Sequence, residues 1–240
     1  MSEDGRGLMA FWSSIEPANQ LAYERWHNCE HMAERVSIPG FLRGRRYRSA
    51  ADAERFLMFY ETRDPDVLSS AAYLAALNAP TRRTREALAW FRKSTRSVFT
   101  LVGMAGTRTA WPAPVLVTAR FSEDAAARGD TASAGAAIDL EALRTAGLAG
   151  RVRRYRLVGD SRSGKSNESA IHGAGIGELD GLLLAESSEV GLLDEPEPQA
   201  RLRQALADAL GPVASAAAEI ETLGLEFALD KPEPATAGAD

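Results

Sequence analysis

The chain has 240 residues, of which 45% are hydrophobic and 25% are charged, and its formal net charge is −5 at pH 7. This composition is ordinary for a globular protein, and the negative charge argues against general binding to nucleic acid. The single cysteine, Cys29, excludes an internal disulfide, and the absence of a leader or a long apolar run predicts a cytoplasmic protein with no membrane partner.

The first half of the chain predicts the order strand, helix, strand, strand, helix, strand. The strands are expected at residues 8–15, 41–49, 54–62 and 97–106, and the helices at residues 19–38 and 64–94. The second helical stretch is interrupted at Asn78 and Pro80, and Thr81 is expected to cap its second part. This order is typical of a ferredoxin-like unit, in which four antiparallel strands carry two helices on one face.

The second half repeats that order. Its strands are expected at residues 115–121, 150–159, 180–189 and 220–229, and its helices at residues 138–147 and 197–212. The tetrapeptide RRYR occurs at 45–48 and again at 153–156, in the second strand of each half, and Glu61 and Glu186 both close a third strand. These shared residues favour a duplication, in which the two halves of the chain are copies of one unit.

The predicted fold class is therefore α+β, with two tandem ferredoxin-like halves that form a pseudo-twofold barrel of eight strands. Two such sheets can pack face to face, so that each covers an apolar face of the other that would otherwise be exposed to water. We expect the first half at residues 1–110, the second at 111–230 and a disordered tail at 231–240, where proline, alanine and acidic residues dominate. Two independent α+β domains are the alternative.

The first helix carries the side chains of most chemical interest. Its expected buried face, at helical spacing, comprises Ala22, Trp26, Cys29, Ala33 and Val36. A polar seam beside that face comprises Tyr23, His27, Glu30 and Glu34, and His31 is expected on the opposite side. A histidine near a carboxylate can exchange a proton around neutral pH, because its ordinary pKa is about 6.5.

The same region resembles the EthD-like proteins of the dimeric α+β barrel superfamily over roughly the first 110 residues. The matching elements are Trp26 and His27, Glu30 and His31, Glu34 and Arg35, Pro39 to Phe41, and Arg46 and Tyr47. Over the second half the resemblance depends on element order alone. It implies a ligand cleft between a sheet and its helices, and activities that range from cofactor-free oxygenases, cyclases and isomerases to haem enzymes and plain ligand binders.

The leading hypothesis is a small-molecule enzyme that moves a proton on an aromatic or enolisable carbonyl compound without an organic cofactor, as a lyase, an isomerase or a cofactor-independent oxygenase. The candidate catalytic residues are His27, Glu30, His31 and Glu34. The candidate substrate-binding residues are Tyr23, Arg46, Tyr47 and His172. Self-association into a homo-oligomer stays open.

Two alternatives use the same helix. A divalent metal or haem enzyme would use His27, Glu30 and His31, since histidines four residues apart on a helix can reach one ion. The string HNCEH also matches the inverted zinc proteases, but the further acidic ligand that they need is not found. The second alternative is a non-catalytic protein that binds a small ligand, with the histidines solvated.

Residues 159–166, GDSRSGKS, match a phosphate-binding loop, but the glycine-rich sequence that follows predicts no suitable helix. We expect residues 159–180 to form a long hairpin loop that acts as a lid and brings His172 over the cleft.

The arginines of the second strand alternate between its two faces. Arg43, Arg45 and Tyr47 are expected on one face, with Arg46 and Arg48 on the other. Buried arginines need carboxylate partners, and Glu61 or Glu186 on adjacent strands could supply them. The functional alternative is an arginine that holds a substrate carboxylate beside a donating Tyr47.

Overall fold

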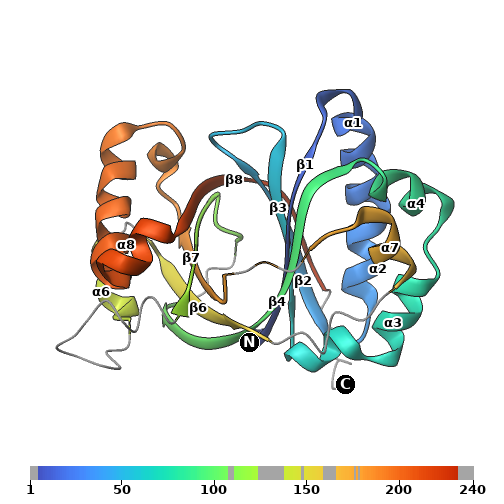
Figure 1. The fold of residues 1–240 in the computed structure, drawn as a ribbon, viewed down its shortest axis with the longest axis horizontal. Helices are drawn as coiled ribbons and strands as arrows, with labels where there is room; N and C mark the ends of the chain where they lie inside the picture. Colours follow the sequence, from blue (N-terminus) through green and yellow to red (C-terminus); the bar gives the residue numbers. More distant parts are fainter. Residues whose placement is uncertain are drawn as a thin grey trace, which may run out of the picture.

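A computed structural model describes residues 5–107, 111–123, 138–146, 149–158, 166–175, 177 and 179–231. Eight antiparallel strands close into a barrel in the order β1-β3-β2-β8-β5-β7-β6-β4. Helices flank the barrel on two opposite sides, with α6 and α8 on one side and α1 to α4 and α7 on the other (Figure 1).

The elements of the first half follow the predicted order with added short helices. They are β1 (Gly7–Ile15), α1 (Pro17–Trp26), the π-helical turn η1 (His27–His31), α2 (Met32–Ser37), β2 (Phe41–Ser49), β3 (Arg55–Thr62), η2 (Pro65–Ser69), α3 (Ala71–Asn78), α4 (Arg82–Leu88) and β4 (Phe91–Gly106). Thr81 caps α4 through the backbone N–H of Thr84, as predicted. Residues 91–94 were expected in a helix and instead begin β4, because this strand extends to pair with the end of β1.

The second half repeats the pattern. Its elements are β5 (Val115–Phe121), α6 (Leu140–Ala146), β6 (Arg151–Leu157), α7 (Asn167–His172), β7 (Gly181–Ser187), η4 (Val190–Leu193), α8 (Pro196–Ala217) and β8 (Glu219–Asp230). The halves join where β2 pairs with β8 and β4 pairs with β6. The repeated tetrapeptides therefore lie in two strands that seal the barrel, and the predicted fold class is confirmed.

One prediction about the connection between β6 and β7 is wrong. Residues 167–172 form the helix α7, which the glycine content of this stretch had argued against, because Ser166 and Ser169 build a capping box and Gly173 ends the helix in a left-handed conformation. The phosphate-loop match, apart from Ser166, lies outside the described residues. The predicted disordered tail also lies outside them, except for Lys231, whose N–H donates to the carbonyl of Leu42.

The hydrophobic side chains divide among three cores. One fills the barrel interior and includes Trp12, Tyr47 and Tyr155. A second lies between the outer face of the first-half sheet and its helices and is rich in aromatic residues and methionine. The third is its counterpart in the second half and is filled by leucine, valine and alanine. Among the described residues, no helix has the length and hydropathy to cross a membrane.

Arg43 of β2 and Arg153 of β6 form charged pairs inside the barrel. Arg43 donates to Glu61 at 3.0 Å, and Arg153 donates to Glu61 at 2.8 Å and to Glu186 at 2.6 Å. The predicted pairing of a β2 arginine with Glu61 is confirmed for Arg43, whereas Arg45 pairs with Asp230 and Arg46 with Glu226.

Candidate active site

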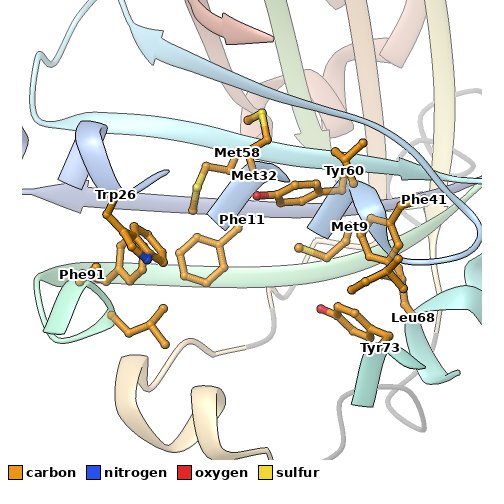
Figure 2. Close-up of a cluster of buried hydrophobic side chains, with 14 of the residues drawn as sticks. Met9, Phe11, Trp26, Met32, Phe41, Met58, Tyr60, Leu68, Tyr73 and Phe91 are labelled. Carbon is orange, nitrogen blue, oxygen red and sulfur yellow. The ribbon is translucent and has the colours of Figure 1, made fainter. Parts of the chain in front are cut away.

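A cavity of about 330 Å³ lies in the aromatic core of the first half, between the sheet and its helices. The apolar part of its wall comprises Met9, Phe11, Met58, Leu68, Tyr73, Leu74, Leu77, Leu88 and Phe91. The polar part includes His31, Arg35, Tyr60, Arg96, Glu168 and His172. Figure 2 shows Phe11, Met58 and Tyr60 on the strands facing the helices, with Tyr73 across from them. Such a wall suits a mainly apolar ligand with a few polar atoms.

A π-helical turn sets the side chains of the first helix. The N–H of Met32 donates to the carbonyl of His27, five residues back, so this turn holds one residue more than an α-helical turn would. His27 and His31 both face the sheet, with ring centroids 5.9 Å apart. Turns of this kind are frequent at functional sites.

The predicted buried face of this helix is wrong in part. Ala22, Cys29 and Ala33 are exposed, whereas Trp26 and Val36 are buried as expected. The large side chains Tyr23, Trp26, His27, His31 and Met32 bury more area than alanine and cysteine would, and the π-helical turn breaks the regular spacing on which the prediction depended. His31 consequently lies on the buried side and not opposite it.

His31 lines the cavity with one ring nitrogen free of hydrogen bonds. Its Nδ1 is buried, has no hydrogen-bond partner among the described residues, and lies 3.9 Å from Oε2 of Glu34. The carboxylate favours the hydrogen on Nδ1, which leaves the lone pair on Nε2. Burial, with the charge of Arg35, lowers the pKa of His31 well below its ordinary value, so the ring is neutral at pH 7. The arrangement can accept a proton.

The second half closes the cavity through α7. The ring of His172 packs edge-on against Phe11, with centroids 5.2 Å apart, and its Nδ1 accepts from the N–H of Ala174 at 3.0 Å. Burial, with a contribution from Arg96, lowers the pKa of His172 to about 4. A buried ion pair between Arg35 of α2 and Glu168 of α7 ties this helix to the first half.

His27 lies behind the cavity wall in a hydrogen-bond network. Arg46 Nη1 lies 3.1 Å from His27 Nδ1 and donates to Asn28 Oδ1 at 2.8 Å, while Arg46 Nε donates to Glu226 at 2.8 Å. On the other side of the ring, Nε2 lies 3.3 Å from the hydroxyl of Tyr60. His27 therefore does not line the cavity itself, and its hydrogen bond to Tyr60 connects it to the cavity wall.

Three other candidates lie away from the cavity. Tyr23 packs on Phe56 with ring centroids 4.9 Å apart, in the same aromatic core but outside the cavity wall. Glu30 accepts from Thr81 at 2.6 Å on the outer side of the helix. Tyr47 points into the barrel, where its hydroxyl donates to the carbonyl of Ala113 at 3.0 Å.

The predicted residues do not form a metal site in the described part of the chain. No three His, Cys, Asp or Glu side chains there are placed to hold one ion, and Glu30 points away from His27 and His31. The cavity offers two neutral histidines, of which His172 already accepts a hydrogen bond. This donor set does not supply the three ligands of the divalent-metal alternative. The haem alternative, which needs one histidine, stays a prediction.

Several cavity residues were not predicted. Tyr60 sits in the apolar run FLMFY, where its hydroxyl gives no sequence signal, and Glu168 comes from a stretch with little periodicity. Arg35 belongs to the motif that carried the resemblance, although no role was assigned to it. Arg96 is adjacent to a predicted strand start. Alternation along β3 is the one pattern that could have placed Tyr60 beside Met58 on the helix-covered face.

Comparisons with known proteins identify the fold. No family model matches the chain, and no curated protein matches it. Among solved structures, an anthrone oxidase-like protein aligns over 99% of both chains with a TM-score of 0.59 at 10% identity. A candidate monooxygenase from Fusobacterium nucleatum aligns over 96% of both chains with a TM-score of 0.54 at 6% identity.

A candidate chlorite dismutase covers 92% of this chain and 95% of its own, with a TM-score of 0.50 and 15% identity. These neighbours have the dimeric α+β barrel fold, with duplicated ferredoxin-like halves. The chain has the same fold. The finer resemblance to EthD-like proteins stays a prediction.

Proposed function

We propose that the chain is a small-molecule enzyme whose first-half cavity binds an aromatic or enolisable carbonyl compound and removes a proton from it with His31. The C–H or O–H bond of the ligand breaks, the electron pair stays on the ligand as an enolate or phenolate, and the proton passes to Nε2 of His31. The observation that carries this proposal is a neutral, buried histidine that lines a largely apolar cavity and has Glu34 on the Nδ1 side of its ring, so that its lone pair is assigned to Nε2.

The surroundings of His31 support the role of a base. Glu34 lies on the Nδ1 side of the ring at 3.9 Å, where its charge stabilises the imidazolium that forms after proton transfer. The ring of Trp26, with its centroid 4.4 Å away, fixes the orientation of the imidazole. His172 is a second neutral histidine on the same cavity, and because its Nδ1 accepts from Ala174, its Nε2–H is left to donate a hydrogen bond to the ligand.

Hydrogen–deuterium exchange tests the proposal without knowledge of the natural substrate. 1-Indanone, a planar aromatic ketone with exchangeable hydrogens next to its carbonyl, is incubated with the protein in D₂O and deuterium uptake is followed by NMR. We expect uptake above the buffer rate, and a decrease of about 100- to 10,000-fold in His31→Ala. Oxygen uptake in the same sample is a second readout, because one structural neighbour is described as anthrone oxidase-like.

Cys29→Ser is the matched control, because Cys29 lies in the same π-helical turn but is exposed. It should leave the exchange rate unchanged. Uptake at the buffer rate with the native protein, or equal rates in the native protein and His31→Ala, would refute the proposal. Since the pKa of His31 is lowered, the rate should be constant from neutral pH upward and should fall only at pH values well below 6.5.

A further inference from the structure

The partners of His27 decide which of its ring nitrogens carries the hydrogen. Arg46 Nη1 lies 3.1 Å from Nδ1, and a guanidinium can only donate a hydrogen bond. Nδ1 must therefore accept. Burial, together with the charge of Arg46, lowers the pKa of His27 well below its ordinary value, so the ring is neutral at pH 7 and its one N–H hydrogen lies on Nε2.

This tautomer sets the direction of the next hydrogen bond. Nε2 lies 3.3 Å from the hydroxyl of Tyr60, and because Nε2 carries the hydrogen it donates to the tyrosine oxygen. Within the described residues, His27 is the one hydrogen-bond partner of the Tyr60 hydroxyl. Because His27 donates to the oxygen, the hydroxyl hydrogen of Tyr60 has no acceptor there. Tyr60 also lines the cavity, and burial raises the pKa of its phenol well above the ordinary value, so the hydroxyl stays protonated.

We infer that Tyr60 donates a hydrogen bond to an oxygen of the bound ligand, and that Arg46 imposes this direction through His27. The ligand class is an aromatic compound with a carbonyl, enolate or phenolate oxygen. The catalytic role of Tyr60 rests on the proposed function. After His31 removes the proton, negative charge develops on this oxygen, and a fixed hydrogen-bond donor stabilises that charge. Tyr60 is then a catalytic residue, whereas His27 and Arg46 are positioning residues.

The tautomer can be measured without any ligand. A long-range ¹H–¹⁵N spectrum distinguishes the two neutral forms of imidazole, and the chain has only three histidines, so His27→Gln assigns the signal. We expect the Nε2–H form for His27 in the native protein. A signal of the Nδ1–H form or of the imidazolium at pH 7 would overturn the inference.

A matched pair of ligands tests the donor. 1-Indanone and indane have the same ring system, and only the ketone offers an acceptor oxygen. The native protein should bind 1-indanone about tenfold more tightly than indane, and Tyr60→Phe should remove this preference while it leaves the affinity for indane within about twofold. A preference that survives in Tyr60→Phe, or the failure of both ligands to bind, would overturn the inference.

A second variant tests the relay, since Tyr60→Phe alone does not involve Arg46. In Arg46→Met/Glu226→Gln, His27 is free to take the Nδ1–H form and to accept from Tyr60, so the preference for 1-indanone should fall although Tyr60 is intact. Glu226→Gln alone keeps the Arg46 donor and should keep the preference. A full preference in the double variant would contradict the relay.

These measurements separate the inference from the proposed function. If the tautomer and the ligand preference are as expected but no deuterium enters 1-indanone, then Tyr60 is a ligand donor in a binding protein and the role of His31 is wrong.

Discussion

Arg153 of β6 donates a hydrogen bond to Glu61 of β3 at 2.8 Å, across the interior of the barrel and between the two halves of the chain. Glu61 also accepts from Arg43 of β2 at 3.0 Å. Burial alone would raise the pKa of the Glu61 carboxyl, but Arg153 and Arg43 together outweigh burial and lower that pKa to about 2. The carboxylate is therefore charged at all ordinary pH values.

The first prediction concerns this carboxylate. Glu61→Gln should lower the free energy of unfolding by about 3–5 kcal/mol, because two buried guanidinium groups lose their shared counter-charge. Urea denaturation measures the change. Glu141→Gln, which removes an exposed ion pair with Arg144, is the control and should have no measurable effect. Equal stability of Glu61→Gln and the native protein would show that the barrel network does not stabilise the fold.

The second prediction concerns the dependence of stability on pH. Burial lowers the pKa of His27, His31 and His172 in the folded chain below 6.5, to about 4 for His172. Between these values and 6.5 the unfolded chain binds more protons, so the stabilisation is complete above pH 6.5 and is lost as the pH falls. Each histidine should contribute a slope of about 1.4 kcal/mol per pH unit below pH 6.5.

Urea unfolding between pH 7.5 and 5 measures this slope. His172→Gln should make it shallower by one histidine's contribution. A free energy of unfolding that stays constant or increases on acidification through this range would be inconsistent with three histidines whose pKa values are lowered in the folded chain.

The third prediction concerns Gly44 of β2, which lies beneath the helix that carries His31. A Cβ atom at this position would stand 2.9 Å from both Met32 Cγ and Tyr60 Cε1. Gly44→Ala should destabilise the fold by about 1–3 kcal/mol and should also weaken 1-indanone binding, because Tyr60 must move. Gly150→Ala is the control, since its Cβ would meet nothing closer than 3.8 Å. Unchanged ligand affinity in Gly44→Ala would mean that Met32 alone absorbs the added methyl group.

The fourth prediction concerns the ion pair that holds α7 over the cavity. Burial raises the pKa of Glu168, with Arg35 opposing that shift, and the neutral amide of Glu168→Gln would leave the Arg35 guanidinium without this carboxylate. Amide hydrogen exchange at residues 167–173 should become faster, with α8 as the internal reference. Arg35→Met/Glu168→Leu replaces the pair with apolar contact and should restore slow exchange. Unaltered exchange in Glu168→Gln would show that other contacts hold α7.

The sequence was sufficient for the fold because strands and turns leave strong local patterns. Alternating runs and breakers located all eight strands. The shared RRYR and the third-strand glutamates indicated the repeat, in which Arg43 lies opposite Glu61 and Arg151 opposite Glu186. The buried face of the first helix could not be predicted from its sequence pattern. Its small apolar residues follow an α-helical period, but the π-helical turn from His27 to His31 changes which side chains meet the sheet.

The sequence proposed site residues mainly on the first helix, together with His172 from the second half, which also lines the cavity. His31 and Glu34 were adjacent in the sequence and remain neighbours in space. Tyr60, Glu168 and Arg96 come from three other elements, and only the closed barrel brings them to one cavity. Glu30 and Tyr47 looked equally suitable in the sequence, but they lie on the outer side of the helix and inside the barrel.

Because of the helix α7, both halves of the chain contribute residues to the cavity wall. His31 and Arg35 come from the amino-terminal repeat, but Glu168 and His172, which complete the enclosure, come from the carboxyl-terminal one. A fragment that ends after β4 would keep His31 and lose the part of the wall that Glu168 and His172 supply. Any reaction in this cavity therefore requires both halves of the chain. In an ancestor with one repeat, a second molecule would have had to supply that part of the wall.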